Sequence, residues 1–504
     1  MSSQIKGPVW SDTAKVPSYS PLNSDTAADV CIVGAGISGL TTAYLLTQVG
    51  KSVVVVDDGP IGSGMTGATT AHLVNALDDR FMDLERYHGE RGSRLAADSH
   101  TAAVDRIESI VTRERIACDF TRLDGYLFLA PEHDESYLDQ ELAAVHRAGL
   151  HNVAKIGRAP GSFDTGPCLR FPNQAQFHPL RYLAGVAEAI ERAGGKIYTQ
   201  THAVEMDGGK NAHVTTKSGH TVRAGSIVVA TNTPVNDRVV VHTKQAPYMT
   251  YVIGAPVAKG AVPLALFWDT GDPYHYIRLV TGIDANHDLL IIGGEDHKTG
   301  QEEDTEACHR RLESWSRERF PMMRELTHKW GGQVMEPVDG LAFIGHNPLD
   351  ADNVYMVTGD SGNGMTHGTI AGMLLTDLIL GKPNPWAALY DPGRITLRAS
   401  GEFAKENLNV AAQYADWLTK GDVASVNDIP KDSGAVIRRD AAKIAVYRDE
   451  TGAVHERSAV CPHLGCIVAW NPAEKTWDCP CHGSRFSKFG EVINGPANVG
   501  LERT

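Results

Sequence analysis

Near its C-terminal end the chain carries side chains that can bind a metal and that lie close together in the sequence. Two segments carry them, "CPHLGCIVAW" and "CPCHGSRF". Cys461 and His463 belong to the first segment, and Cys479 and His482 belong to the second. Two thiolates can hold one iron of a two-iron, two-sulfur cluster while two imidazoles hold the other iron. We therefore predict a metal centre at these four residues.

Zinc is the alternative metal, because two cysteines and two histidines also suit zinc. A zinc site leaves Cys466 and Cys481 unexplained, and a c-type haem needs Cys-x-x-Cys-His where this chain has Cys-Pro-Cys-His. The flanking "HLGC" and "CHGS" make the two segments resemble those of the Rieske [2Fe–2S] family. In that family the remaining pair commonly forms a disulfide, so the resemblance implies a Cys466–Cys481 bond. "NGPAN" (494–498) resembles the family's proline loop, which covers the cluster.

A second motif lies near the other end of the chain and predicts a dinucleotide site. Gly34, Gly36 and Gly39 follow an apolar run and open a helical segment. The first glycine permits a tight turn, the second lets the backbone approach a pyrophosphate, and the third lets helix pack on strand. Asp57 ends the next strand, where a carboxylate can accept hydrogen bonds from a ribose. The alternative is a tight turn in an ordinary helix–strand unit.

Two further glycine-rich stretches indicate which dinucleotide binds. They are "GPIGSGMTGATTAHL" (59–73) and "VTGDSGNGMTHG" (357–368). Together with "GSIVVATN" (225–232) and "MEPVDGLAFIG" (335–345), they make residues 28–395 resemble the D-amino-acid-oxidase-like flavoproteins, which include sarcosine and glycine oxidases. This resemblance implies FAD as the cofactor.

The motifs and the resemblance together give a set of expected FAD contacts. These are Gly34, Gly36, Ile37, Ser38, Gly39, Asp57, Asp58, Thr66, Thr70, Ala71, His72, Val204, Gly359, Gly362, Asn363, Gly364 and Met365. In some relatives a histidine near the first loop is the covalent attachment point of the flavin. His72 is therefore either such a residue, a flavin neighbour, or an ordinary hydrogen-bonded loop histidine.

The stretch "PYHYIRL" carries the candidate substrate residues. On a strand, Tyr274, Tyr276 and Arg278 share one face and His275 lies on the other. The Arg278 guanidinium could clamp a substrate carboxylate, and the tyrosines could wall the flavin. The alternative is an edge strand with a solvated arginine. We take Arg278, Tyr276, Tyr274 and His72 as the catalytic candidates, and the further candidate bases are His275, His297, His346 and His367.

The order of motifs predicts an α/β, Rossmann-like FAD-binding domain, an interleaved substrate domain with a mixed β-sheet, and a small all-β Rieske domain. The expected divisions are an N-terminal extension (1–27), FAD-binding segments (28–90, 170–240, 330–395), substrate segments (91–169, 241–329), a helical connector (396–420) and the Rieske domain (421–504).

Charge and composition narrow the classes of partner and compartment. The net charge is −14, and residues 421–504 contribute only −1 of it, with ten Lys and Arg against eleven Asp and Glu. An acidic main body argues against nucleic acid and anionic membranes as partners. The sequence shows no signal peptide and no stretch apolar enough to span a membrane. Four singly scattered cysteines are typical of reduced thiols, so we expect a cytoplasmic protein.

The two cofactors together predict an oxidoreductase. We expect a flavin dehydrogenase or oxidase that oxidises a C–N bond of an amine or amino-acid-like substrate and passes electrons through the cluster to an external acceptor. Only one G-x-G-x-x-G motif is present, which argues against NAD(P)H as the donor. The sequence lacks a motif for a mononuclear iron site, and this absence argues against a Rieske oxygenase. Two alternatives remain: a reductase whose cluster is reduced by a partner protein, and a flavin kept only as a structural relic.

Overall fold

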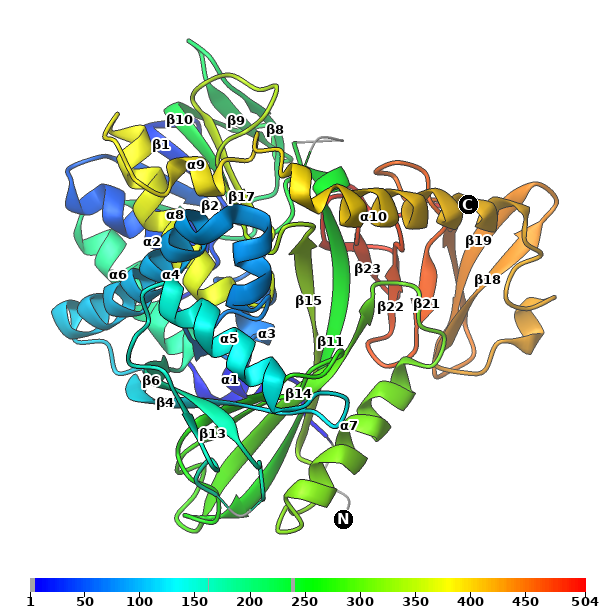
Figure 1. The fold of residues 1–504 in the computed structure, drawn as a ribbon. Coiled ribbons are helices and arrows are strands. Elements are labelled where there is room, and N and C mark those ends of the chain that lie inside the picture. Colours follow the sequence, from blue (N-terminus) through cyan, green and yellow to red (C-terminus); the bar gives the residue numbers. More distant parts are fainter. Residues whose placement is uncertain (1–4, 162, 237–240) are drawn as a thin grey trace.

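The computed structural model describes residues 5–161, 163–236 and 241–504. Two large sheets with their helices form the main body, and two small sheets form a C-terminal part beside it (Figure 1). The two large sheets interleave along the chain, so each is assembled from segments distant in sequence.

The first large sheet has eight strands, and its path runs β16-β17-β10-β1-β2-β7. Along this path, each neighbouring pair between β17 and β7 is parallel. Strand β16 pairs antiparallel with β17, and strand β9 pairs antiparallel with β10. The buried runs "VCIV" and "VVVV" fit inner strands covered on both faces, by helices such as α2 on one face and by the β8–β9 hairpin on the other. The strands are β1 (Thr26–Val33), β2 (Val53–Val56), β7 (Lys196–Tyr198), β8 (Ala203–Asp207), β9 (His213–Thr216), β10 (Thr221–Val229), β16 (Phe343–His346) and β17 (Val354–Thr358).

A group of helices packs on this sheet and on one another. Helix α2 lies against α8 at very short range, because a Cβ on Gly372 of α8 would come within 2.6 Å of the Thr41 side chain. Two small residues in α8, Gly368 and Gly372, thereby allow the two helices that follow the glycine turns to touch. The helices of the main body are α1 (Val9–Thr13), α2 (Ile37–Gln48), α3 (Met65–Ala68), α4 (Phe81–Glu114), α5 (Glu135–Arg147), α6 (Pro179–Arg192), α7 (Thr305–Arg319), α8 (Gly364–Ile379) and α9 (Ala387–Tyr390).

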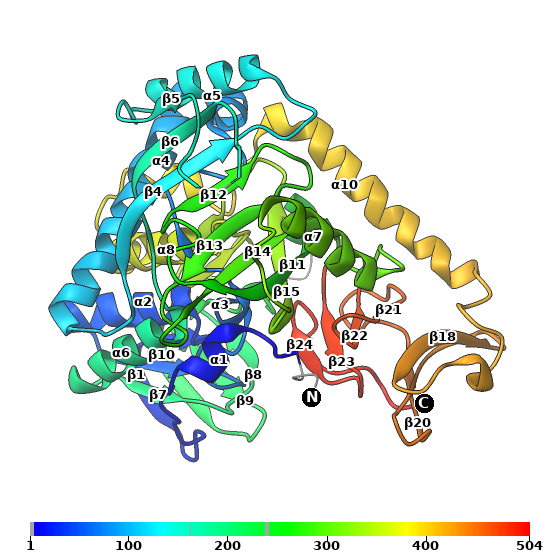
Figure 2. The same ribbon diagram turned by 90° about the horizontal axis from the view of Figure 1, so that it is seen from below.

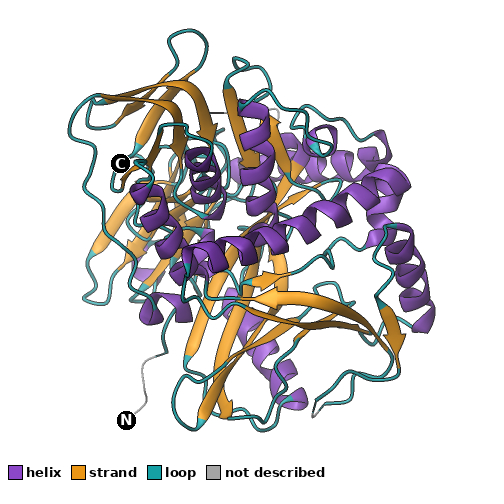
Figure 3. Ribbon diagram, turned by 90° about the vertical axis from the view of Figure 1, so that its left-hand side faces the viewer, coloured by secondary structure: helices purple, strands orange, loops and turns teal. Residues whose placement is uncertain are grey.

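The second large sheet is mixed and has nine strands in the order β15-β11-β14-β13-β12-β4-β6-β3, with β5 paired to β6. Only β4 and β12 pair in parallel. Helix α7 covers β11 and β14, and the long strands of this sheet lie below a layer of helices in Figure 3. The strands are β3 (His72–Leu73), β4 (Thr121–Phe128), β5 (Ala154–Ile156), β6 (Cys168–Gln176), β11 (Gln245–Ala258), β12 (Leu266–Asp269), β13 (Tyr276–Val280), β14 (His287–Lys298) and β15 (His328–Pro337).

The C-terminal part consists of a three-stranded and a four-stranded antiparallel sheet. Helix α10 (Ser400–Gln413) leads to it and runs along the outside of the molecule in Figure 2. Trp477 and Phe486 are fully buried between the two sheets and form the centre of a separate small core. The strands are β18 (Ser433–Arg439), β19 (Ala442–Arg448), β20 (Val454–Ser458), β21 (Ala469–Asn471), β22 (Thr476–Asp478), β23 (Arg485–Ser487) and β24 (Val492–Asn494).

This architecture confirms the predicted fold class. The glycine-rich stretch 357–368 forms the end of β17, the turn after it and the start of α8. The predicted domain divisions stay predictions, but the N-terminal segment is packed: Trp10 is buried and its Nε1 donates to the carbonyl of Thr69 at 2.6 Å. None of the helices in the described part of the chain combines the length and apolar composition that a membrane crossing requires.

Adding one methyl group at Gly39 tests the contact between α2 and the turn before it. A Cβ at this position would lie 1.9 Å from the carbonyl oxygen of Gly34. Overpacking of this kind costs about 1–3 kcal/mol. We expect Gly39→Ala to lower the Tm in a thermal unfolding experiment. The exposed Gly157, whose Cβ would meet nothing within 4 Å, gives the control variant Gly157→Ala. An unchanged Tm in Gly39→Ala would contradict the close contact.

Candidate active site and metal centre

A cavity of about 320 Å³ lies where the two large sheets and the C-terminal part meet. The turn between β1 and α2, the loop over residues 57–78 and the turn between β17 and α8 line one side. Strands β11 to β15 line another side, and residues 492–498 of the C-terminal part complete the wall. All three parts of the molecule therefore shape one space.

The first glycine turn opens at the carboxyl end of β1. Gly34 has φ +111°, and a Cβ there would lie 2.3 Å from the carbonyl oxygen of Ala230 at the end of β10. Asp57 accepts hydrogen bonds from the N–H groups of Ala35 (2.6 Å) and Gly59 (2.8 Å). Burial raises the pKa of Asp57 to about 6, although both hydrogen bonds favour the ionised form. The turn thus holds a carboxylate beside the N-terminus of α2.

The second glycine turn joins β17 to α8 and faces the same cavity. Gly359 and Gly362 have φ of +72° and +69°, which favours glycine. A Cβ on Gly362 would come within 2.0 Å of Oδ2 of Asp78. Asp78 therefore lies directly on the backbone of this turn.

The structure brings most of the expected FAD contacts into the cavity wall. Those that line it are Gly34, Gly36, Ile37, Ser38, Asp57, Asp58, Thr66, Thr70, His72, Gly359, Gly362, Asn363, Gly364 and Met365. Three expected contacts lie outside the wall. Gly39 packs beneath Gly34, Ala71 is fully buried, and Val204 is 43% exposed while its neighbour Ala203 lines the cavity.

The wall fits a ligand that carries polar groups. Nδ2 of Asn232 and Oδ1 of Asn363 are buried and have no hydrogen-bond partner among the described residues. Such atoms cost free energy unless a ligand or water satisfies them. Two glycine turns with helix N-termini, two orphaned amide groups and a continuous space between them fit a dinucleotide.

Two tyrosines form the far end of the cavity. Tyr274 donates to Oδ2 of Asp78 at 2.7 Å, and the hydroxyls of Tyr276 and Thr250 lie 2.7 Å apart. The two tyrosine rings are 5.3 Å apart between centroids. This end therefore combines aromatic faces with a carboxylate.

His72 lies beside these tyrosines with both ring nitrogens in contact. Nδ1 is 3.0 Å from Oγ1 of Thr70, and Nε2 is 3.3 Å from the carbonyl oxygen of Ile277. Burial lowers the pKa of His72 to about 3, so the ring is neutral. These contacts favour a hydrogen-bonded loop histidine over a covalent attachment point.

Arg278 lies behind the cavity wall, where the sequence analysis expected a carboxylate clamp. Its Nη1 donates to the carbonyl oxygens of Thr70, Ala71 and Phe177 at 2.8, 2.9 and 3.2 Å. The guanidinium also lies 5.2 Å from the ring centroid of Trp10. The structure thus gives Arg278 a supporting contact under the Thr70–Ala71 loop. The alternative of a solvated arginine on an edge strand is wrong, because Arg278 is buried and β13 pairs on both sides.

Of the four further histidine candidates, only His367 lines the cavity. Its Nδ1 lies 2.9 Å from the carbonyl oxygen of Asp360, and burial lowers its pKa to about 4. His275 stacks on Trp315 on the other face of the sheet, as the strand alternation indicates. His297 contacts Tyr251, and His346 is exposed.

The four predicted metal ligands converge in the C-terminal part. The thiols of Cys461 and Cys479 are both buried, and the hydrogen bond between them lowers the pKa of Cys461 to about 7. The rings of His463 and His482 lie 5.0 Å apart between centroids. Burial lowers the pKa of His482 to about 3, which leaves the neutral imidazole that metals bind. Two adjacent thiols beside two adjacent imidazoles fit the ligand set of a Rieske cluster.

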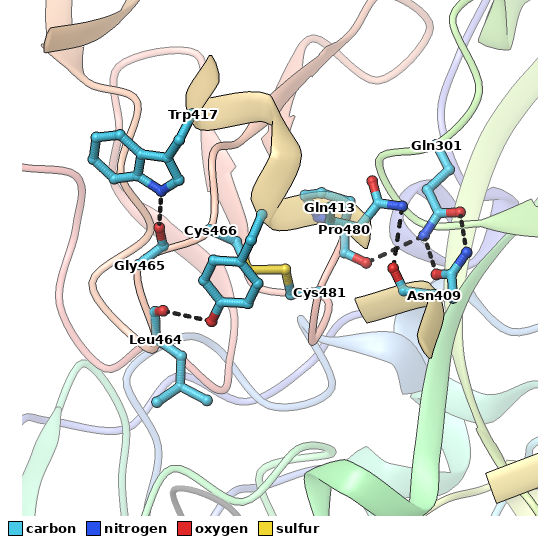
Figure 4. Close-up of a disulfide and its surroundings, with 10 residues drawn as sticks. Gln301, Asn409, Gln413, Trp417, Leu464, Gly465, Cys466, Pro480 and Cys481 are labelled. Carbon is cyan, nitrogen blue, oxygen red and sulfur yellow. Dashed lines mark hydrogen bonds between the residues drawn. A yellow bond between two sulfur atoms is a disulfide. The ribbon is translucent and has the colours of Figure 1, made fainter. Parts of the chain in front are cut away.

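A disulfide between Cys466 and Cys481 joins the two ligand loops (Figure 4). The 3₁₀ helix after α10, Tyr414–Leu418, supports the first loop. Tyr414 donates to the carbonyl oxygen of Leu464 at 2.8 Å, and Trp417 donates to that of Gly465 at 3.0 Å. The connector therefore holds the loop that carries two of the ligands.

Sequence reasoning missed the residues that join the cavity to the metal centre. Gln333 of β15 lines the cavity, and its Nε2 donates to the carbonyl oxygen of Gly483 at 2.7 Å. Its Oε1 accepts from Asn494 at 3.2 Å. His242, from the main body, lies 5.0 Å and 6.0 Å from the ring centroids of His463 and His482. No motif marks Gln333 or His242, because each acts through a contact between distant segments.

Comparisons with known families agree with this geometry. Residues 29–378 match the family described as FAD dependent oxidoreductase, and residues 419–503 match the Rieske [2Fe-2S] domain. The chain belongs to the FAD-dependent oxidoreductases and carries a C-terminal Rieske domain. It is an enzyme whose cofactors are FAD and a [2Fe-2S] cluster.

Individual relatives share one or both parts. A Bacillus subtilis (strain 168) protein titled putative Rieske 2Fe-2S iron-sulfur protein YhfW is 31% identical over 494 residues, which are 97% of this chain and 95% of that protein. The gamma-glutamylputrescine oxidoreductase of Escherichia coli (strain K12) is 26% identical and covers 76% of this chain and 92% of its own length. The crystal structure of glycine oxidase from Geobacillus kaustophilus has a TM-score of 0.60 at 18% identity, and covers 73% of this chain and 99% of its own.

Removing the disulfide tests its role in holding the metal loops. In the double variant Cys466→Ser, Cys481→Ser the four ligands remain, but the two loops lose their covalent link. We expect the Rieske EPR signal and the bound iron to be lost at a lower temperature than in the unmodified protein. Cys118→Ser, which removes a buried cysteine in the core of the main body, is the control. Identical loss temperatures in the double variant and the control would show that the ligand loops do not need the link.

Proposed function

We propose that this enzyme is a dehydrogenase that oxidises a C–N bond of an amine or amino-acid-like substrate and passes the electrons through its Rieske cluster to an external acceptor. The observation that carries the proposal is the shared wall: residues 492–498 of the Rieske domain line the same cavity as the two glycine turns. One chain thus supplies a two-electron site and a one-electron site side by side.

The oxidation of a C–N bond releases two electrons, which these two sites together can accept and pass on. FAD held between the two glycine turns would supply a two-electron acceptor for the hydride of the substrate carbon, while the substrate nitrogen gives up a proton. Water would hydrolyse the imine product to a carbonyl compound and an amine. A cluster held by Cys461, His463, Cys479 and His482 would supply a one-electron path for the two electrons that each substrate releases. Rieske centres lie at roughly −150 to +300 mV, which suits a reduced flavin as donor.

The names of relatives support the substrate class. One is a gamma-glutamylputrescine oxidoreductase, and another is a glycine oxidase, so both names denote compounds that contain amine nitrogen. We infer that a substrate of this class would lie in the same cavity, beside the flavin. The two tyrosines at the end of the cavity wall, Tyr274 and Tyr276, lie in a position to contact it.

Gln333 supports a direct route from the cavity to the cluster. Its side chain forms part of the cavity wall and donates to Gly483, the residue after the ligand His482. In the first ligand loop, Pro462 and Leu464 are exposed on either side of His463. An outside acceptor can therefore approach this loop at these two residues.

Anaerobic reduction separates this proposal from its alternatives. Purified protein loaded with FAD and cluster is mixed with amines, N-methylated amino acids, amino acids and NAD(P)H while flavin absorbance and the Rieske EPR signal are recorded. We expect an amine or amino acid to bleach the flavin and the cluster signal to follow. In Cys461→Ser the flavin should still bleach, but electron delivery to a one-electron acceptor should fall at least tenfold, because one iron loses a ligand. Reduction only by NAD(P)H or by a partner protein would mean that electrons flow the other way.

A substitution at Gln333 tests the route itself. Gln333→Leu keeps the size of the side chain but removes its hydrogen bonds to Gly483 and Asn494. In stopped-flow experiments we expect flavin reduction by substrate to keep its rate, and the following reduction of the cluster to slow several-fold. Gln301→Leu is the matched control, because Gln301 contacts Pro480 on the same loop at 3.4 Å but does not line the cavity. Equal cluster reduction rates in both variants would remove Gln333 from the route.

A further inference from the structure

The cavity wall is rich in carboxyl groups and contains no lysine or arginine among the described residues. Its acidic members are Asp57, Asp58, Asp78, Asp296, Glu336 and Asp360. The first two lie at the dinucleotide end, beside Gly34 and α2. The other four surround the second glycine turn and the tyrosine end, which the proposed function assigns to the substrate.

The buried arginines nearest to this end are engaged elsewhere. Arg278 donates to three main-chain carbonyls behind the wall. Arg80 donates to the carbonyl oxygens of Leu77 at 3.2 Å and Asp269 at 2.9 Å. Neither guanidinium lines the cavity. In the described part of the chain, therefore, no cationic side chain is placed to pair with a substrate carboxylate.

Asp296 supplies a second and independent observation. Its side chain lines the cavity from β14, and its buried Oδ1 has no hydrogen-bond partner among the described residues. Burial raises the pKa of Asp296 to about 7, and the charge of Asp78 acts in the same direction. A buried carboxylate oxygen without a partner is costly, and a cationic ligand is a partner that would relieve this cost.

The tyrosines complete a site suited to a cation. Tyr274 and Tyr276 present rings 5.3 Å apart at the same end of the cavity, and Tyr274 holds Asp78 against Gly362. An ammonium group is attracted both to carboxylates and to the faces of aromatic rings. A carboxylate at this position would instead meet two acidic side chains without a compensating charge.

We propose that the substrate is an amine cation without a carboxylate next to its reacting nitrogen, with its ammonium group bound by Asp296 and Asp78 beside the rings of Tyr274 and Tyr276. The inference rests on the proposed C–N oxidation and narrows it to amines, as opposed to amino acids. Asp296 acts here as a binding residue that contacts the substrate directly.

Pairs of compounds that differ only by a carboxylate test the inference. The pairs are putrescine and ornithine, phenethylamine and phenylalanine, and dimethylamine and sarcosine. Binding to the full-length, FAD-loaded protein is measured anaerobically by isothermal titration calorimetry, and flavin reduction is followed with the same compounds. We expect at least one amine to bind at least tenfold more tightly than its carboxylated partner. We also expect that amine alone of its pair to reduce the flavin.

The variant Asp296→Asn keeps the shape of the side chain and removes its charge. We expect it to weaken binding of the preferred amine at least tenfold and to reduce the preference over the carboxylated partner. Glu90→Gln, at an exposed position away from the cavity, is the control for the loss of one negative charge. Retained FAD content and Tm in Asp296→Asn show that the fold is intact.

The outcomes separate the inference from the proposed function. Tighter binding and faster reduction with the amino acid of every pair would overturn the amine preference and leave C–N oxidation standing. Flavin reduction by NAD(P)H alone, with no binding of any amine, would overturn both. Amine binding that is unaffected by Asp296→Asn would remove Asp296 from the site.

Discussion

The backbone contact between Gly483 and the main body is the constraint on which the arrangement of the two cofactor sites depends. A Cβ on Gly483 would lie 2.5 Å from Cβ of Pro247 and 2.7 Å from Nε2 of Gln333, so only glycine fits. This contact lays the second ligand loop directly on β11 and β15. Because His482 precedes Gly483, the same contact brings its ring to within 6.0 Å of the ring of His242. The loop over 492–498 then closes the cavity from the same side.

Buried acids play two different electrostatic roles in the main body. Burial alone would raise the pKa of Asp339, but the Arg394 guanidinium, 2.7 Å away, holds it well below its usual range. Among the described residues no salt bridge reaches Asp79 or Glu336, and burial raises the pKa of both. Oγ of Ser361 contacts a carboxyl oxygen of each of them. A hydroxyl has one proton to donate, so the second contact requires a proton held by one of the two acids. The second glycine turn therefore rests on protonated as well as ionised carboxyl groups.

Residues whose role is local could be predicted from the sequence, and residues whose role arises from packing could not. The glycine turns and the four metal ligands depend on short spacing along the chain, and the structure places each set together. Arg278 occupies the strand face that alternation predicts. Its guanidinium, however, lies behind the cavity wall against the ring of Trp10, which is more than 260 positions away in the sequence. Asp296 and Gln333 belong to no motif, because β14 and β15 meet the cavity only after the nine-stranded sheet has formed.

The disulfide that joins the two ligand loops is also buried away from solvent. Cys466 and Cys481 are each 1% exposed, and Tyr414 and Trp417 lie over the neighbouring backbone. Thiol–disulfide exchange begins with a thiolate that approaches one of the sulfur atoms, so enclosed sulfurs react slowly whatever the surrounding thiol concentration. In the folded protein the bond is therefore expected to react slowly with small-molecule reductants.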